Sequence, residues 1–133
     1  MTPEYRTWLI EMFAPLGEIS VRRVFGYNGL YLGDAMFGLV AAERIYLKTN
    51  EASRQAFEHE GSTALTYTTG DGELHVTSYW EIPGVLYDEP EKLVRWARLA
   101  HEVALNSSTA KRRQTRAIKQ TRIGPPVRKQ SKP

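Results

Sequence analysis

The charge of this chain changes sign near residue 106. Residues 1–106 contain 9 Lys+Arg and 15 Asp+Glu, a net charge of −6, whereas residues 107–133 contain 9 Lys+Arg and no acid, a net charge of +9. A segment with so many like charges and so few apolar residues cannot bury enough surface to offset its ordering entropy. We therefore expect an acidic folded domain over 1–106 and a basic, disordered tail over 107–133.

Length and cysteine content narrow the class of protein. Residues 1–106 are enough for one small domain with one core, and the chain contains no cysteine. Disulfides, a thiolate nucleophile and Cys-ligated zinc are therefore excluded. The N-terminus lacks the pattern of a secretory signal, and the longest apolar stretch, around 35–42, is too short to span a bilayer. We expect a cytoplasmic protein without a membrane partner.

Three helices are predicted from apolar spacing and capping residues. Thr2 suits the N-cap of the first helix, whose aromatic-rich stripe, Trp8 included, should enter the core. Asn50 can cap a short helix over 51–60, and the third helix should run over 90–106.

Strand-like runs fill the rest of the domain; they are residues 20–25, 30–32, 36–42, 45–48, 65–69 and 74–80. Asn28-Gly29 is interpreted as a hairpin turn after the first of them. The run 36–42 is almost continuously apolar, as a central strand covered on both faces would be. The order of helix, several strands, helix, two strands and helix predicts an α+β domain with helices packed on one face of a mainly antiparallel sheet.

The sequence contains no recognisable catalytic or metal-binding constellation. The histidines, His59, His75 and His101, fall on different predicted elements and in no metal-binding spacing. The glycine pairs belong to hairpin turns rather than phosphate loops, and no GxSxG motif occurs. No set of convergent polar groups marks a ligand pocket. We expect a protein that is not an enzyme and that uses neither a cofactor nor a metal.

A group of aromatic and basic residues on the strands is a candidate partner-binding surface. Alternation along a strand makes one of Tyr79 and Trp80 face away from the core. The candidate contacts to a partner are Arg23, Tyr46, Lys48, Tyr79 and Trp80, with Tyr31 and Arg22 in the same part of the sheet. Two interpretations stay open: a surface that contacts protein or nucleobases, and a routine half-buried sheet face with snorkelling cations.

The basic tail is a candidate nucleic-acid-binding segment. Its candidate phosphate contacts are Lys111, Arg112, Arg113, Arg116, Lys119, Arg122, Arg128 and Lys129. Such cations give steeply salt-dependent binding without sequence preference. Residues 110–122 could form a helix against a polyanion. The alternative is a solubilising arm, or one that folds back on the acidic body.

Four stretches, taken in order, resemble the hallmarks of the TfoX N-terminal domain family. The segment RVFGYNGLYL at 23–32 resembles the family's Arg-apolar-Phe/Met-Gly-x-x-Gly-Leu/Ile-Tyr run, and MFGLV at 36–40 resembles its MFaLV strand. The segment ERIYLK at 43–48 is similar to its acid-Arg-apolar-Tyr-Leu-Lys run. The segment SYWEIP at 78–83 and the following helix resemble its SYW-x-x-P motif and closing helix.

This resemblance implies both a fold and a function. The family fold is α+β and similar to secretion-chaperone-like domains. The best-known members, the TfoX/Sxy proteins, regulate natural competence together with the cyclic-AMP receptor protein. They carry a second, helical C-terminal domain where this chain has its basic segment. The resemblance therefore implies a non-enzymatic regulatory module that contacts the transcription machinery or a regulator. The charge of residues 107–133 adds the expectation of a tail that associates with DNA.

Two further expectations accompany this interpretation. The alternative function is a nucleic-acid-binding protein in its own right, for RNA or DNA, with affinity supplied by the tail. A homodimer through a sheet edge or the terminal helix is also compatible with the sequence, since open sheet edges must be covered.

Overall fold

A computed structural model describes residues 1–24 and 26–121, with side chains through residue 107. The helices of this described part are α1 (Pro3–Met12), α2 (Glu51–His59) and α3 (Pro90–Thr121), with 3-10 turns η1 (Ala14–Leu16) and η2 (Gly84–Asp88). The strands are β1 (Ile19–Val24), β2 (Tyr27–Leu32), β3 (Ala35–Ala41), β4 (Arg44–Lys48), β5 (Ala64–Thr68) and β6 (Leu74–Glu81).

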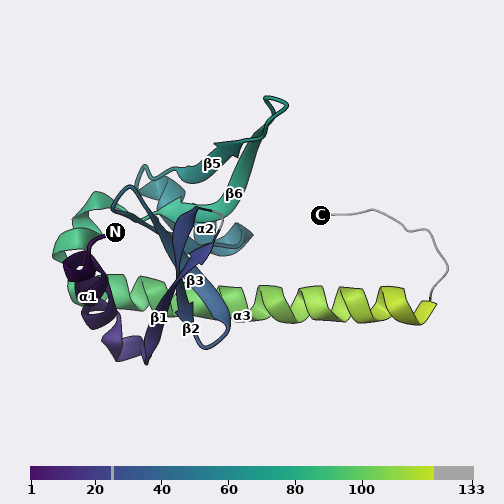
Figure 1. The fold of residues 1–133 in the computed structure, drawn as a ribbon, viewed down its shortest axis with the longest axis horizontal. Coiled ribbons are helices and arrows are strands. Elements are labelled where there is room, and N and C mark those ends of the chain that lie inside the picture. The colour runs from purple at the N-terminus through teal and green to yellow at the C-terminus, as the bar shows by residue number, and fades with distance from the viewer. Residues whose placement is uncertain (25, 122–133) are drawn as a thin grey trace.

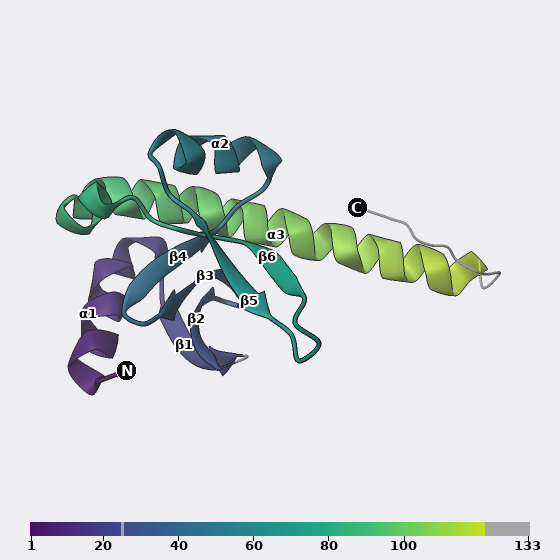
Figure 2. The same cartoon turned by 90° about the horizontal axis from the view of Figure 1, so that it is seen from above.

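The strands form one antiparallel sheet with the order β1-β2-β3-β4-β6-β5. Helix α3 crosses one face of the sheet against β3 and β4, while α1 packs on β1 and α2 on β6 (Figures 1 and 2). The predicted α+β fold is therefore confirmed. Strands β1 and β5 are the two edges of the sheet, and the homodimer stays a prediction.

The hydrophobic core lies between α3 and the sheet. Phe13 and Phe37 are fully buried, and their rings meet edge to face with centroids 5.5 Å apart. Burying side chains of this size stabilises the fold by about 1.5–3 kcal/mol each. The predicted inner stripe of the last helix is buried, as shown by Leu93, Ala97, Ala100, Val103 and Ala104.

Two helix N-termini are capped as the sequence predicts. Thr2 Oγ1 accepts a hydrogen bond of 3.1 Å from the Tyr5 amide at the start of α1. In α2, Asn50 Oδ1 accepts from the Ser53 amide at 2.7 Å, and Ser53 Oγ accepts from the Asn50 amide at 3.0 Å. This reciprocal capping box satisfies two backbone donors that a short helix would otherwise leave unpaired.

The predicted turn at Asn28-Gly29 is wrong. Both residues lie inside β2, and Val24 pairs with Tyr27, so the reversal falls before β2 and uses Gly26 at φ +83°. Gly29 serves packing instead, because an added Cβ would lie 2.7 Å from the sulfur of Met36 on β3. The loop between β1 and β2 is two residues long and ends in Gly26, whose positive φ suits a hairpin turn as well as Asn-Gly would.

The prediction that Trp8 belongs to the core is also wrong. Its side chain is 37% exposed and stacks on Tyr5, with ring centroids 5.4 Å apart. The inner face of α1 is centred on Leu9 and Phe13, both fully buried. A neighbouring position on a helix is rotated by about 100°, which moves Trp8 to the rim.

The last helix continues beyond its predicted end. Helix α3 is continuous to Thr121, and its C-terminal part projects past the sheet (Figures 1 and 2). Residues 107–121 contain no glycine or proline and are rich in Ala, Lys, Arg and Gln, which favour helix over a stop. The division of the chain at residue 106 stays a prediction.

Among the described residues there is neither a membrane-spanning helix nor a metal-binding cluster of side chains. No helix there is long and apolar enough to cross a bilayer. No group of three or more His, Asp or Glu side chains in the same part of the chain could hold a metal ion.

Candidate functional site: the concave face of the sheet

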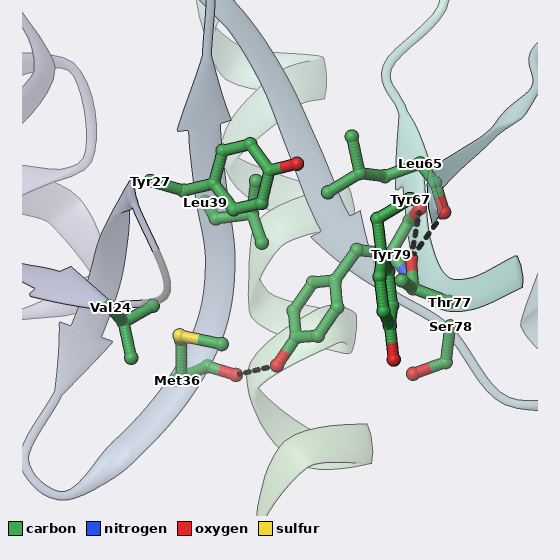
Figure 3. Close-up of a pocket in the computed structure, with 9 residues that line it drawn as sticks. All are labelled: Val24, Tyr27, Met36, Leu39, Leu65, Tyr67, Thr77, Ser78 and Tyr79. Carbon is green, nitrogen blue, oxygen red and sulfur yellow. Dashed lines mark hydrogen bonds between the residues drawn. The ribbon is translucent and has the colours of Figure 1, made fainter. Parts of the chain in front are cut away.

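The sheet face opposite the helices is concave and contains a pocket of about 620 Å³ (Figure 3). Both edge strands contribute to its wall, Val24 from β1 and Tyr67 from β5, so the sheet curls until its two edges face each other. The lining residues are neutral, mostly aliphatic or aromatic side chains, namely Val24, Tyr27, Met36, Leu39, Leu65, Tyr67, Thr77, Ser78 and Tyr79. A volume of this size is typical of sites for small organic ligands.

Hydrogen bonds across the sheet hold the pocket walls in place. The Tyr79 hydroxyl donates to the backbone oxygen of Met36 at 3.2 Å, which ties β6 to β3 past the intervening strand β4 (Figure 3). Thr77 Oγ1 donates to the Leu65 carbonyl at 2.8 Å, which fixes β5 on β6. Burial, with a smaller effect of the neighbouring Tyr31, raises the pKa of Tyr79 to about 12. The Tyr79 hydroxyl is therefore neutral at physiological pH and keeps its proton for this bond.

Two cations lie on tyrosine rings beside the pocket. Lys48 Nζ donates a hydrogen bond of 2.7 Å to Ser78 Oγ and lies 5.1 Å from the centroid of the Tyr79 ring. The Arg22 guanidinium lies 4.4 Å from the centroid of the Tyr31 ring. Each contact pairs a cation with the negative face of an aromatic ring. The lining residues of the pocket are uncharged, and both cations lie over tyrosine rings near it.

The structure brings together three of the five predicted partner contacts. Strand pairing places Tyr46 opposite Glu81 and Lys48 opposite Tyr79, so Tyr46, Lys48 and Tyr79 share the concave face. All three are half-buried, which matches the predicted partial exposure. Burial raises the pKa of Tyr46, and the nearby Glu81 carboxylate raises it further.

The other two predicted contacts lie on the opposite face of the sheet. Trp80 pairs with the fully buried Leu47 and packs against the core, half-buried. Arg23 pairs with Asn28 on the face of β1 that also carries Val21, and its side chain is exposed. The five residues therefore do not form one surface, and no contact of any of them with a partner has been tested.

An exposed apolar surface adjoins Trp80 on strand β6. Leu74 and Val76 are 63% and 68% exposed, and alternation puts them on the same face of the strand as Trp80. They belong to the β5–β6 hairpin, which extends away from the body of the domain (Figure 1). We call Leu74 and Val76 the hairpin patch.

The predicted nucleic-acid contacts fall at the end of the chain. Lys111, Arg112, Arg113, Arg116 and Lys119 belong to the segment that α3 carries past the sheet, in the part of the helix without described side chains. Arg122, Arg128 and Lys129 lie outside the described residues. Their role stays a prediction from charge.

Sequence reasoning missed the pocket and most of its lining. No pocket was expected, yet the apolar run over residues 36–42 contained the signal, since it predicted a strand covered on both faces. Helix α3 covers one face of β3, whereas Met36 and Leu39 on the other face line the pocket. Tyr27 fell between the predicted strands 20–25 and 30–32, although it begins β2, and Tyr67 lies on the edge strand β5.

Comparison with known proteins places the chain in a family. The sequence model of the TfoX N-terminal domain matches residues 11–104. The chain belongs to the TfoX N-terminal domain family. It is also 29% identical over 101 residues to Protein Sxy of Escherichia coli (strain K12), an alignment that covers 76% of this chain. The alignment covers 48% of Protein Sxy, so the chain spans about half the length of this curated relative.

Proposed function

We propose that the chain is a non-enzymatic regulatory module of the competence type, which acts on transcription by contacting a protein partner. The observation that carries this proposal is the family match over residues 11–104, together with the similarity to Protein Sxy. The chain works in the cytoplasm under this proposal, where the transcription machinery or a regulator is its partner.

The hairpin patch supports a protein contact. Large aliphatic side chains that are about two-thirds exposed, on a hairpin that extends from the domain, are the kind of surface that another protein covers. Trp80 lies further along the same face of β6 and supplies a half-buried aromatic beside it. Aromatic residues next to aliphatic ones are enriched at the centres of such interfaces.

The charge split supports an accessory role for the C-terminal segment. The nine cations of residues 107–133 have no acid among them, while residues 1–106 have a net charge of −6 and repel phosphate. In this proposal the segment holds the module near DNA without reading sequence. The protein partner then determines which genes respond.

A salt titration of DNA binding tests the accessory role. We would compare the full chain with K111Q/R112Q/R113Q on a short mixed-sequence duplex, with R6Q/R95Q/R98Q as the control that removes the same charge from exposed positions of the body. Each lost phosphate contact lowers the slope of log K against log salt by about 0.9, so the tail variant should lower it by up to about 2.7. The control should bind as wild type.

Two results would change this part of the proposal. If the wild-type chain does not bind the duplex at low salt, the tail has no role at DNA. If the tail variant binds as tightly as wild type while the body control does not, the domain itself recognises nucleic acid, which is the alternative function.

The protein contact is tested with purified cyclic-AMP receptor protein from the same organism. Analytical ultracentrifugation should show a complex with the wild-type chain and its loss in L74S/V76S. The control V85S/L99S removes two aliphatic side chains that are about half exposed elsewhere on the domain, and it should leave the complex intact. Absence of a complex with the wild-type chain would contradict the competence-type assignment.

A further inference from the structure

The outer face of strand β3 is apolar, although no helix of the described chain packs on it. Leu39 is only 4% exposed and points into the concave side with Met36, while α3 covers the opposite face (Figures 2 and 3). A solvated antiparallel face normally alternates to polar residues. This face instead forms the floor of the pocket of about 620 Å³, a volume within the range of small-molecule sites.

Contacts within the protein fix the aromatic walls of this pocket. The rings of Tyr27, Tyr67 and Tyr79 lie around the open space (Figure 3). The Tyr79 hydroxyl is bonded to the Met36 oxygen, and the Tyr67 ring stacks on His75 with centroids 5.0 Å apart and planes 10° apart. Rings held in this way favour a flat aromatic partner, because aromatic rings attract one another in stacked and edge-to-face arrangements and an ordered site loses little entropy on binding.

The protein already satisfies much of the hydrogen-bonding capacity of the lining. Thr77 Oγ1 donates to the Leu65 carbonyl at 2.8 Å and accepts from the Tyr79 amide at 3.1 Å. The hydroxyls of Tyr27 and Tyr67, by contrast, make no hydrogen bond to a described residue. A ligand therefore meets apolar surface for most of its area, with two hydroxyls that can bond to a polar atom on it.

The described part of the lining offers a ligand no charged group. The two cations near it are engaged by the protein itself. The Lys48 ammonium contacts Ser78 Oγ and the Tyr79 ring, and the Arg22 guanidinium contacts the Tyr31 ring and a backbone carbonyl. Moving an ionised group from water into a site without a counter-charge is unfavourable, so the pocket favours an uncharged ligand.

We propose that the concave pocket binds a small, flat, uncharged aromatic molecule. The ligand lies on the floor formed by Met36 and Leu39, among the rings of Tyr27, Tyr67 and Tyr79. A polar atom of the ligand bonds to one of the two hydroxyls that the protein leaves to it. The proposal goes beyond the regulatory role proposed above and does not depend on it, because the hairpin patch is not part of the pocket lining.

Two fluorescent probes with the same ring skeleton test the class of ligand. N-Phenyl-1-naphthylamine is uncharged, and 8-anilinonaphthalene-1-sulfonate adds one sulfonate to it. The uncharged probe should bind the full chain with one-site stoichiometry. The sulfonate should bind at least about fivefold more weakly, because its charge finds no partner in the pocket lining.

Two variants of the lining locate the probe by opposite changes in the pocket. Tyr27→Ser combined with Tyr67→Ser removes two aromatic walls, whereas Val24→Phe fills part of the space from strand β1. Each should weaken the uncharged probe at least about tenfold, since the first loses apolar contact area and the second leaves less room. Circular dichroism and urea midpoints confirm that each variant is folded before its affinity is compared.

Two other apolar surfaces provide the control variants. Leu99 is 49% exposed and lines the groove between α2 and α3, and Leu74 and Val76 form the hairpin patch. Leu99→Ser and L74S/V76S should leave the affinity for the uncharged probe within about twofold of wild type, because both lie outside the pocket lining. L74S/V76S also separates this proposal from the proposed function, since it should lose the protein partner and keep the probe.

Any of four results would overturn the proposal. The first is a wild-type chain that does not bind the uncharged probe at one site. The second is a sulfonate that binds as tightly as the uncharged probe or more tightly. The third is loss of binding in Leu99→Ser or L74S/V76S while both lining variants keep it. The fourth is displacement of the probe by oligothymidylate, with loss of oligothymidylate binding in the double tyrosine variant, which would assign the pocket to single-stranded nucleic acid.

Discussion

The hydroxyl of Tyr79 on strand β6 donates a hydrogen bond of 3.2 Å to the backbone oxygen of Met36 on β3, past the strand that separates them. Only a sheet that curls strongly brings these two groups together. The bond therefore reports on the curvature that creates the concave pocket.

Removing this hydroxyl should destabilise the domain. Tyr79→Phe keeps the ring and its contact with Lys48 but leaves the Met36 oxygen without this partner, and we expect a loss of about 0.5–1.5 kcal/mol in the free energy of unfolding. Urea denaturation measures it. Tyr67→Phe is the control, because the Tyr67 hydroxyl has no hydrogen bond to a described residue, and it should change stability by less than about 0.5 kcal/mol. Equal losses of stability in the two variants would show that the hydrogen bond from Tyr79 to Met36 does not stabilise the domain.

Alkaline pH should destabilise the folded state through buried tyrosines. Burial raises the pKa of both Tyr79 and Tyr5 to about 12, above the value of about 10 in an unfolded chain. The folded state then holds more protons than the unfolded state above pH 10, so the stability is complete below pH 10 and is lost as the pH rises toward 12. Urea midpoints at pH 8 and pH 11 should differ less in Tyr79→Phe than in wild type, and an unchanged difference would contradict this assignment.

Gly38 is required where β3 and β4 approach each other. A Cβ at this position would lie 2.6 Å from the backbone oxygen of Tyr46, which cannot move without breaking the sheet. We expect Gly38→Ala to cost about 1–3 kcal/mol in the free energy of unfolding. Gly70→Ala is the matched control, because no atom lies within 4 Å of its added Cβ, and it should be neutral or slightly stabilising. A larger loss of stability in Gly70→Ala than in Gly38→Ala would contradict the close approach of Gly38 to Tyr46.

The capping box of α2 can be tested separately. Asn50→Ala removes the side chain that accepts from the Ser53 amide, and a loss of about 1 kcal/mol is expected. Gln55→Ala, at an exposed position of the same helix, is the control and should be neutral. Thermal unfolding followed by circular dichroism gives both values, and similar melting temperatures for the two variants would refute a stabilising cap.

The fold could be predicted from the sequence because its strongest local signals agree with the tertiary structure. Thr2, Asn50 and the stripe beginning at Leu93 each specify a helix boundary or face that packing then uses. The prediction of a turn at Asn28-Gly29 was wrong because Gly26 also suits a hairpin turn, and local preference does not decide between the two positions. The prediction of Trp8 as a core residue was wrong because Trp8 lies at the margin of the apolar face of the helix. Only the packed structure shows which residues of such a face are buried.

The candidate site was only partly predictable for a different reason. Strand alternation, which depends only on neighbouring residues in the sequence, selected Tyr46, Lys48 and Tyr79. The strand register confirms that these three share a face. The pocket depends on the curl that brings Val24 and Tyr67 from opposite edges of the sheet to one space. Curvature over six strands is not encoded in any single run of residues, so alternation could not reveal it.

Transcript profiling in cells that lack the gene tests the central claim most directly. The wild-type gene and the R6Q/R95Q/R98Q control should restore the same set of transcripts. L74S/V76S should fail to restore them because it loses the protein contact, and K111Q/R112Q/R113Q should restore them weakly because it loses contact with DNA. If deleting the gene changes no transcripts while the protein is being made, or if both variants restore every transcript to the wild-type level, the chain is not a regulator of this kind.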